Sequence, residues 1–327
     1  MRVCYFSCSN IFGGVENIIL QTLNELCKSY EVALILPKGA NFLNKFDKRV
    51  KIYEYKSYDK RYNIFLYFEI IKFLHELKPD ILHTHGAKAT QMGFILSKFL
   101  KFKFIATKHN NRKGKIFNKI QNVIAVSKNV ANTINHESRV IYFGIDKQNI
   151  KPNLSKTFTI TAVGRLDKIK GFDILINEVK KLKFNFVLQI VGDGFERENL
   201  QNLINSLNLK NKVKLLGFCQ NIPQILANSN LQVISSIKEG FPLTLLEGLF
   251  YAPIVISTPV GGIVEILDDE FLINHENLSD KIDEIYMNYD AKVEIFKEKN
   301  KNIIENFKFE KYILNLQNYY EEIYEKS

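Results

Sequence analysis

The stretch FTITAVGRLDKIKGFDILI, residues 158–176, decides the fold of this 327-residue chain. Its first seven residues form an apolar run of strand length, and such runs alternate along the chain with segments of helical period. The other runs are VCYFS (3–7), VALILP (32–37), DILHTH (80–85), FKFIAT (102–107), NVIAVS (122–127), FVLQIVG (186–192), VKLLG (213–217), LQVISS (231–236) and PIVIST (253–258). Short runs rich in Val and Ile on this rhythm predict parallel strands covered on both faces by helices. The predicted fold class is therefore α/β, with doubly wound, Rossmann-like sheets.

Two series of these runs predict two domains, and the length agrees at roughly 150 residues per domain. The division is expected near residues 151–155, where Pro and Asn precede a new strand. The expected domains are residues 1–152 and residues 153–305, followed by a C-terminal helical segment, 306–327. Ligands of open α/β sheets bind at the carboxyl ends of the strands, so we expect a site in a cleft between the two facing domains.

The composition excludes several classes of protein. A hydrophobic fraction of 46% and a charged fraction of 24% are those of a globular protein, and exclude a disordered or fibrous chain. No apolar run approaches the roughly 18 residues of a membrane span. The start, MRVCYFSCSN, lacks the features of a secretory leader. The four cysteines lack metal-ligand spacing, and we interpret them as reduced thiols of a cytosolic protein.

The net charge of +10 is unevenly distributed. Residues 1–152 carry 25 Lys and Arg against 11 Asp and Glu, a balance of +14, whereas residues 153–327 carry 20 against 24, a balance of −4. Residues 81–136 contain ten basic side chains and no acidic one, with aromatic residues among the lysines of 94–104 and again in 62–74. Buried helix faces with solvated lysines would explain this pattern. A peripheral contact with an anionic membrane surface, or binding to a nucleic acid, would explain it too.

In each predicted domain, a glycine-containing loop follows the first strand. In SNIFGGVE (9–16), Gly13 and Gly14 allow close approach of a ligand to a helix N-terminus that favours an anion, although a tight strand-to-helix turn has the same pattern. In GRLDKIKG (164–171), Arg165 and Lys170 place two cations near a strand end, which suits a pyrophosphate. A solvated basic loop is the alternative.

The loop KEGFPLTLLEG (238–248) is the strongest candidate for a site. Pro242 suits the first position of a helix, so main-chain amides around Gly240, Phe241 and Leu243 would face an anion. Glu239 and Glu247 lie eight residues apart on either side of that helix start. Two carboxylates so placed can accept hydrogen bonds from two sets of sugar hydroxyls with a phosphate between them. The alternative is a capped helix with one exposed Glu.

Three histidines follow two successive strand ends. His83 and His85 share one face of a strand, and His109 follows the next strand, so all three could reach the expected cleft. Two histidines at this spacing suggest zinc, but no Asp, Glu or Cys in residues 81–136 offers a third ligand. The sequence also lacks a D-x-D motif. We therefore expect no metal.

The segment EGFPLTLLE resembles the E-x7-E motif of retaining nucleotide-sugar glycosyltransferases of the GT-B fold, family 4. The resemblance extends in order over nearly the whole chain. The further matching segments are FGGVE (12–16), HTHGAKA (83–89), TKHNN (107–111), AVSKNVA (125–131), VIYFGID (140–146), GRLDKIKGFDILI (164–176), IVGDGFERENL (190–200), VKLLGF (213–218) and PVGGIVEIL (259–267). One departure is Tyr142-Phe143-Gly144, where the family more often has Pro-Asn-Gly. The resemblance implies a first domain that binds the acceptor, a second that binds the donor, and a C-terminal helix that packs back on the first.

The resemblance also implies a role for each candidate residue. Arg165 and Lys170 would hold the donor pyrophosphate, Glu239 would contact the transferred sugar, and Glu247 the ribose. The implied phosphate cradle consists of the main-chain amides of Gly13, Gly14, Gly240, Phe241 and Leu243; Pro242 lies beside them but has no amide hydrogen. Gly192 and Gly194 would lie near the nucleoside. His109 would lie at the reacting sugar. Glu16, His83 and His85 are the acceptor-side candidates.

The resemblance implies a retaining transfer of a hexose or N-acetylhexosamine from a nucleotide diphosphate sugar to a glycan or lipid-linked acceptor. UDP is the commonest nucleotide of the family, and a GDP-sugar (mannosyl) transferase is the alternative. The implied setting is bacterial surface polysaccharide, lipopolysaccharide or lipooligosaccharide synthesis, in the cytoplasm and on the cytoplasmic face of the inner membrane. We expect no cofactor beyond the nucleotide sugar, and no nucleic acid as partner. A basic nucleic-acid-binding protein is the alternative from another class.

Overall fold

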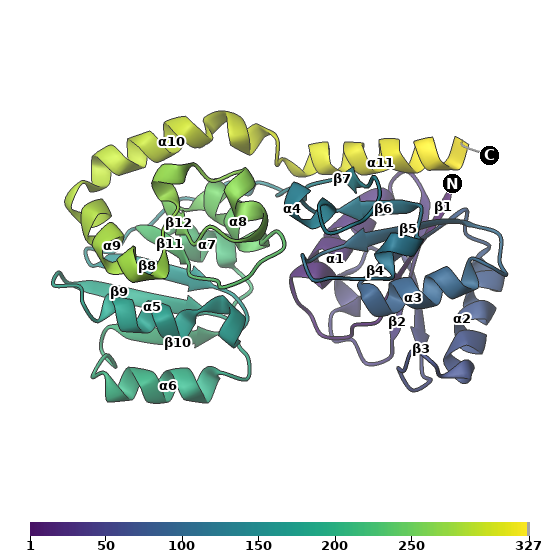
Figure 1. Ribbon diagram of the computed structural model, residues 1–327, viewed down its shortest axis with the longest axis horizontal. Helices are drawn as coiled ribbons and strands as arrows, with labels where there is room; N and C mark the ends of the chain where they lie inside the picture. The colour runs from purple at the N-terminus through teal and green to yellow at the C-terminus, as the bar shows by residue number, and fades with distance from the viewer. Residues whose placement is uncertain (326–327) are drawn as a thin grey trace. The chain divides into compact units, whose positions relative to one another are not determined.

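The computed structural model describes residues 1–325, which form two compact α/β units (Figure 1). One unit contains residues 1–143 and the chain from Glu310 onward, and the other contains Gly144–Phe309. Each unit has one parallel sheet with helices on both faces, so the predicted fold class is confirmed. No helix within residues 1–325 is long and apolar enough to cross a membrane.

The sheet of the first unit has the strand order β3-β2-β1-β4-β5-β6-β7, and every neighbouring pair is parallel. The strands are β1 (Arg2–Ser7), β2 (Glu31–Pro37), β3 (Lys51–Tyr55), β4 (Ile81–His85), β5 (Lys103–Lys108), β6 (Asn122–Ala125) and β7 (Arg139–Val140). The α-helices are α1 (Gly14–Leu26), α2 (Ile64–Leu77), α3 (Ala87–Leu96), α4 (Lys128–Ala131) and α11 (Phe309–Glu325), with short 3₁₀ turns at Leu43–Lys45 and Phe117–Lys119.

The alternation of side chains along these strands gives each face of the sheet its own helices. On one face, Cys4, Phe6 and Leu82 pack with apolar residues of α2 and α3. On the other face, the hydroxyl of Tyr5 meets that of Tyr320 on α11, at 2.7 Å. The C-terminal helix is therefore part of the first unit.

The second unit repeats this order in a five-stranded parallel sheet, β10-β9-β8-β11-β12. Its strands are β8 (Phe158–Val163), β9 (Phe186–Val191), β10 (Val213–Gly217), β11 (Leu231–Ile234) and β12 (Val255–Ser257). Its α-helices are α5 (Phe172–Val179), α6 (Arg197–Ser206), α7 (Ile222–Ala227), α8 (Leu243–Tyr251), α9 (Leu278–Met287) and α10 (Tyr289–Glu305). Its 3₁₀ turns are Lys168–Lys170, Gly261–Glu265, Asp269–Phe271 and His275–Asn277.

The units divide at Phe143/Gly144, earlier than the expected division after residue 152. The cause is hydrogen bonding that holds this connecting segment to the second unit. The Tyr251 hydroxyl donates to the carbonyl of Asp146 at 3.2 Å and accepts from the amide of Gln148 at 2.8 Å. At the other crossing, the amide of Ile145 donates to the carbonyl of Phe307 at 2.8 Å. The chain therefore returns to the first unit at residue 310 rather than 306.

Candidate active site

The strand order of each unit places several of the candidate residues at a switch point, where neighbouring strands connect in opposite directions. In the first unit this point lies between β1 and β4, and in the second between β8 and β11. Ligands of such sheets bind outside the carboxyl ends of the strands at this point. The loop with Gly13 follows β1 and His85 ends β4, while Lys170 follows β8 and Glu239 follows β11.

Lys170 and Glu239 form the polar centre of the second unit. The Lys170 ammonium donates to Oε1 of Glu239 at 2.6 Å, and the two side chains are 20% and 11% exposed. The hydroxyl of Ser236 donates to the same oxygen at 2.6 Å. A lysine ammonium has three donors, and Glu239 takes one of them. The pair therefore presents a cation and a carboxylate together at the end of the sheet.

The backbone around Lys170 is held against the end of β11. The Ser235 hydroxyl donates to the carbonyl of Lys170 at 2.9 Å, and Nε2 of His275 lies 2.8 Å from the carbonyl of Ser235. Gly171 has a φ of +63°, and a Cβ there would lie 2.2 Å from that same carbonyl oxygen. Only glycine fits this approach, so the loop carrying Lys170 has a fixed position.

The second predicted cation, Arg165, does not join the Lys170–Glu239 pair. Its side chain is 70% exposed, and Nε donates to Oδ2 of Asp167 at 2.8 Å. Gly192 lies beside this loop with a φ of +135°, and a Cβ there would be 1.9 Å from the carbonyl oxygen of Gly164. The two loops therefore pass in direct backbone contact. Gly194 follows on the second of them.

Helix α8 begins in the loop that follows β11. Pro242 is the N-cap residue of α8, with φ −76° and ψ 126°, rather than its first helical residue as predicted. The angle φ suits proline, but the extended ψ places helical geometry one residue later. No side chain caps the helix. The carbonyl of Gly240 accepts from the amide of Gly262 at 2.7 Å, and the buried Phe241 ring stacks on Phe307.

Glu247 lies in the second turn of α8, and its side chain is partly buried. Within residues 1–325 its carboxylate makes no hydrogen bond or ion pair. Burial raises its pKa to about 7, because the charged form loses water without gaining a partner. An unpartnered carboxyl group of this kind can accept hydrogen bonds from ligand hydroxyls.

The first unit offers a second open helix start. Gly13 is the N-cap of α1 in an extended conformation, and no side chain caps the helix, which begins at Gly14. Both glycines are exposed. Glu16 lies in the first turn, where a Cβ on Gly13 would come within 3.1 Å of its Oε2 atom. The loop therefore presents free main-chain amides next to one carboxylate.

The three histidines form a continuous group on the face covered by α11. Nδ1 of His85 lies 3.0 Å from Nε2 of His109, and the rings of His83 and His85 are 4.5 Å apart. Burial lowers the pKa of His83 to about 3 and that of His109 to about 4, and it lowers the pKa of His85 well below its usual range. All three are therefore neutral at pH 7.

Two of these histidines do not have the accessibility that the sequence predicted. His83 and His85 are 1% and 4% exposed, so neither ring is open to an acceptor. Both ring nitrogens of His83 are already used, by Tyr320 and Thr107 at 2.6 Å each. His109 is half-buried, and its ring stacks on Phe143, which lies in the segment where the sequence departs from the family.

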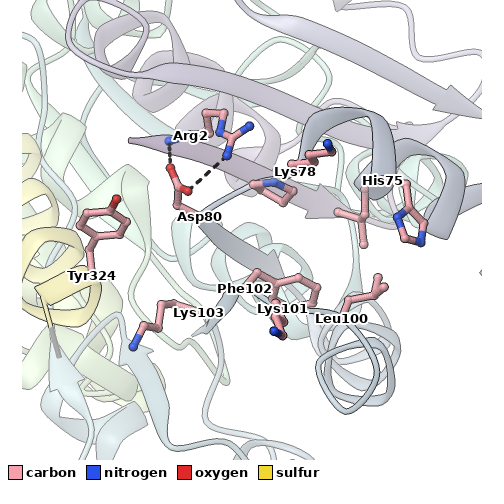
Figure 2. Close-up of a pocket in the computed structure, with 11 residues that line it drawn as sticks. Arg2, His75, Lys78, Asp80, Leu100, Lys101, Phe102, Lys103 and Tyr324 are labelled. Atoms are coloured by element: carbon pink, nitrogen blue, oxygen red, sulfur yellow. Dashed lines mark hydrogen bonds and ion pairs between the residues drawn. The ribbon is translucent and has the colours of Figure 1, made fainter. Parts of the chain in front are cut away.

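A hollow of about 710 Å³ lies at the other end of the strands of the first unit's sheet, away from these three histidines (Figure 2). It adjoins the amino ends of β1 and β5, and its lining includes Arg2, Lys78 and Lys101. Asp80 offsets part of this charge, because its Oδ2 accepts from the amide of Arg2 at 2.7 Å and its Oδ1 lies 3.5 Å from the guanidinium. No group of three metal-ligating side chains is found within residues 1–325.

Family models match both halves of the chain. The model described as Glycosyl transferases group 1 matches residues 145–308, half of the chain. This chain belongs to the group 1 glycosyl transferases. The model described as Glycosyltransferase Family 4 matches residues 12–149. The chain is therefore a glycosyltransferase of the GT-B fold, and the resemblance seen in its motifs is confirmed.

Individual relatives agree with this assignment. The chain is 24% identical over 308 residues to a Campylobacter jejuni enzyme named as an α-1,4-N-acetyl-D-galactosaminyltransferase acting on a diphospho-undecaprenol-linked glycan, covering 85% of this chain and 84% of that one. It is 26% identical over 312 residues to the O-antigen biosynthesis glycosyltransferase WclY of Escherichia coli, covering 82% and 83%. Anabaena HepE in complex with UDP-glucose has the same fold, with a TM-score of 0.85, 19% identity, and coverage of 97% and 98%.

Three residues that hold the candidate groups of this glycosyltransferase in place were not predicted from its sequence. Ser236, Asp167 and His275 contact Glu239, Arg165 and the backbone beside Lys170. A pair of serines directly after a strand was a signal for Ser236, and an Asp two residues from an Arg was a signal for Asp167. Nothing in the local sequence marked His275.

Proposed function

We propose that this glycosyltransferase moves a hexose or N-acetylhexosamine from a UDP-sugar to a glycan or lipid-linked acceptor, with retention of anomeric configuration. The proposed setting is bacterial surface polysaccharide, lipopolysaccharide or lipooligosaccharide synthesis. A GDP-sugar is the alternative donor. The names of the Campylobacter and Escherichia relatives support the setting, and the UDP-glucose complex of HepE supports the nucleotide.

The observation that carries the proposal is the Lys170–Glu239 pair, because Glu239 lies four residues before Leu243, the first residue of the uncapped helix α8. A donor diphosphate needs positive charge that does not move during the reaction. Lys170 supplies a fixed ammonium, and the main-chain amides of the first turn of α8 supply the positive end of a helix dipole. Glu239 and Glu247 then accept hydrogen bonds from the sugar and the ribose, as the family motif implies. Arg165 would turn from Asp167 toward the diphosphate.

In the proposed reaction, the bond between the anomeric carbon and the diphosphate oxygen breaks, and the electron pair leaves with the diphosphate. The acceptor oxygen attacks the same face of the sugar, and its proton passes to an oxygen of the departing phosphate. Lys170 and the α8 amides stabilise the charge that develops on the leaving group. His109 orients the sugar with a neutral ring. In this proposal these groups do the work for which other transferases use a divalent ion.

An anionic membrane surface is the proposed partner that brings the enzyme to its acceptor. The start of α2 and the loop before it expose Tyr58, Tyr62, Ile64, Phe65 and Phe68, each by at least 59%. Basic side chains flank them at Lys56, Lys60 and Arg61. Aromatic and basic side chains together suit the interface of an anionic bilayer. Of the aromatics in 94–104, Phe102 and Phe104 pack against the core, Phe94 is partly buried, and Phe99 is exposed.

Flotation with liposomes tests this partner. Wild-type protein should float with vesicles that contain anionic lipid and not with neutral ones, and Phe65→Ser/Phe68→Ser should lose flotation. Leu314→Ser is the matched control, because Leu314 is also exposed but lies on α11. Equal flotation with both kinds of vesicle contradicts the electrostatic contact. The proposal gives no role to a nucleic acid, so a random oligonucleotide should show no salt-dependent binding.

A panel of nucleotide sugars tests the central activity. UDP-glucose, UDP-galactose, their N-acetylated forms and GDP-mannose are each added to the full chain, and thermal stabilisation and slow hydrolysis of the donor are measured. We expect one UDP-sugar to raise the melting temperature and to be hydrolysed. A response to GDP-mannose alone selects the alternative donor, and no response to any of them contradicts the proposal.

A further inference from the structure

His109 has one ring nitrogen occupied by a second histidine. Nε2 of His109 lies 3.0 Å from Nδ1 of His85. Nδ1 of His109 makes no hydrogen bond within residues 1–325. Because both rings are neutral, one of the two facing nitrogens carries a proton and the other accepts it. The contact therefore couples the tautomer of His109 to that of His85 and leaves Nδ1 of His109 as the atom that can meet a ligand.

His85 is held so that it cannot turn away from this contact. The Tyr5 ring stacks on it with centroids 4.8 Å apart, and the His83 ring packs at 4.5 Å. Among residues 1–325, Nε2 of His85 is buried without a hydrogen-bond partner, which is unusual for a buried polar atom. Packing alone would be better served by an apolar ring. The presence of an imidazole here is explained by its other nitrogen, which faces His109.

Tyr320 of α11 hydrogen-bonds to His83 and Tyr5, the two residues whose rings pack against His85. Its hydroxyl lies 2.6 Å from Nδ1 of His83 and 2.7 Å from the hydroxyl of Tyr5, and Nε2 of His83 lies 2.6 Å from Oγ1 of Thr107. Tyr320 therefore anchors both rings that enclose His85. The C-terminal helix thus reaches the histidine at the candidate site through buried hydrogen bonds and ring packing.

We propose that His85 is a positioning residue that sets the tautomer and orientation of His109, and that Tyr320 of α11 holds His85 in place through His83 and Tyr5. This rests on the proposed function, which places His109 at the transferred sugar. The ligand class is the sugar of a nucleotide sugar, met by Nδ1 of His109. Neither His85 nor Tyr320 touches the ligand.

Two pairs of variants of the full chain test the proposal, with the nucleotide sugar that the wild type hydrolyses fastest as the probe. His85→Phe keeps a ring but loses the nitrogen, whereas His85→Asn restores a hydrogen-bonding atom near the position of Nδ1. We expect His85→Phe to lower kcat by about 10- to 100-fold with KM changed less than about twofold, because a misplaced group loses rate rather than binding. His85→Asn should recover most of that loss. Equal losses, or no loss, overturn the proposal.

Tyr320→Phe and Tyr312→Phe form the second pair. Each removes one buried tyrosine hydroxyl from the same helix. The Tyr312 hydroxyl bonds Thr22 at 3.1 Å, whereas that of Tyr320 bonds His83 and Tyr5. Tyr320→Phe should lower kcat by about 3- to 10-fold, while Tyr312→Phe should remain within about twofold of the wild type. Parallel losses in both variants would mean that α11 only stabilises the unit, and would overturn the role of Tyr320.

Nitrogen NMR of protein labelled at histidine gives a readout that does not depend on activity. In the wild type, the two ring nitrogens of His109 should have well-separated resonances, as expected for one fixed tautomer. In His85→Phe the two resonances should move toward each other, because both tautomers become populated. Unchanged resonances overturn the inference even if turnover falls. If the wild type hydrolyses no nucleotide sugar, the proposed function fails, and these resonances still decide the role of His85.

Discussion

The two units have sheets of the same strand order but opposite chemistry at the switch point. The first unit has His83 and His85 on β4 at this point and His109 after the neighbouring strand β5, all three neutral, in a stretch, 81–136, without any acidic side chain. The second unit places the Lys170–Glu239 ion pair there, with Glu247 on the next helix. The shared topology therefore determines where a ligand can bind, and the side chains after each strand determine which part of a ligand is bound.

The largest expected effect comes from breaking the charged centre of the second unit. Glu239→Ala should lower turnover of the preferred nucleotide sugar by about 100- to 1,000-fold, because a polar group aimed at the reacting sugar is lost and Lys170 loses its partner. Initial rates at saturating donor measure this. Glu198→Ala, an exposed glutamate of α6, is the control. Near-normal turnover of Glu239→Ala would contradict a role for the charged centre of the second unit in the reaction.

One glycine from each unit allows two causes of lost stability to be compared: steric crowding by a new Cβ, and an unfavourable backbone conformation. Gly192→Ala places a Cβ 1.9 Å from the carbonyl oxygen of Gly164, whereas Gly39→Ala, also at positive φ, meets nothing within 4 Å. We expect Gly39→Ala to cost about 1 to 2 kcal/mol and Gly192→Ala clearly more, through displacement of a loop. Urea unfolding measures both free energies. Equal costs would show that the close approach of the two loops does not constrain the second unit.

The histidines should make the first unit sensitive to mild acid. Their pKa values are lowered from 6.5 in the folded state, to about 3 for His83 and about 4 for His109, so the unfolded chain binds protons first as the pH falls. Stability is therefore complete above pH 6.5 and declines as the pH falls toward 4, by about 1.4 kcal/mol per pH unit for each buried histidine. Urea unfolding at pH 7, 6 and 5 measures the slope. His83→Gln should reduce it, and an unchanged slope would contradict the neutral buried state.

Glu247 should titrate in the opposite sense, with a smaller effect because it is one group. Its pKa is raised from 4.5 to about 7, so the folded state binds the proton that the unfolded state has lost. Its contribution to stability is complete below pH 4.5 and is lost as the pH rises toward 7. The difference in unfolding free energy between wild type and Glu247→Gln should fall by up to about 1.4 kcal/mol per pH unit over that range. A difference that is independent of pH would mean that the carboxylate is solvated.

The sequence predicted the central strands well because they are buried on both faces and appear as continuous runs of Val and Ile. It missed β3, KIYEY, an edge strand whose side chains are mostly only partly buried, and the two-residue β7. The predicted C-terminal helical segment, 306–327, begins only at Phe309, after a break that follows α10 at Glu305. Edge strands and short breaks carry little periodicity, because packing rather than local pattern decides them.

The candidate site could be predicted from the sequence where charged residues occur at a characteristic spacing within a short motif. Lys170 and Glu239 are in contact, as two members of one charged site should be. The environment of His83 was not predictable, because its partner Tyr320 lies 237 residues later in the chain. Spacing along one strand shows which side chains share a face, but not which distant helix covers that face.

Titration calorimetry with UDP and GDP tests the central claim, that Lys170 in the second unit binds the donor diphosphate. Wild-type protein should bind one of the two nucleotides. Lys170→Ala should weaken that binding by about 10- to 100-fold, the loss expected for a hydrogen bond to a charged group. Lys168→Ala, an exposed lysine of the same turn, should remain within about twofold of the wild type. If neither nucleotide binds, or if Lys170→Ala binds as well as Lys168→Ala, the account is contradicted.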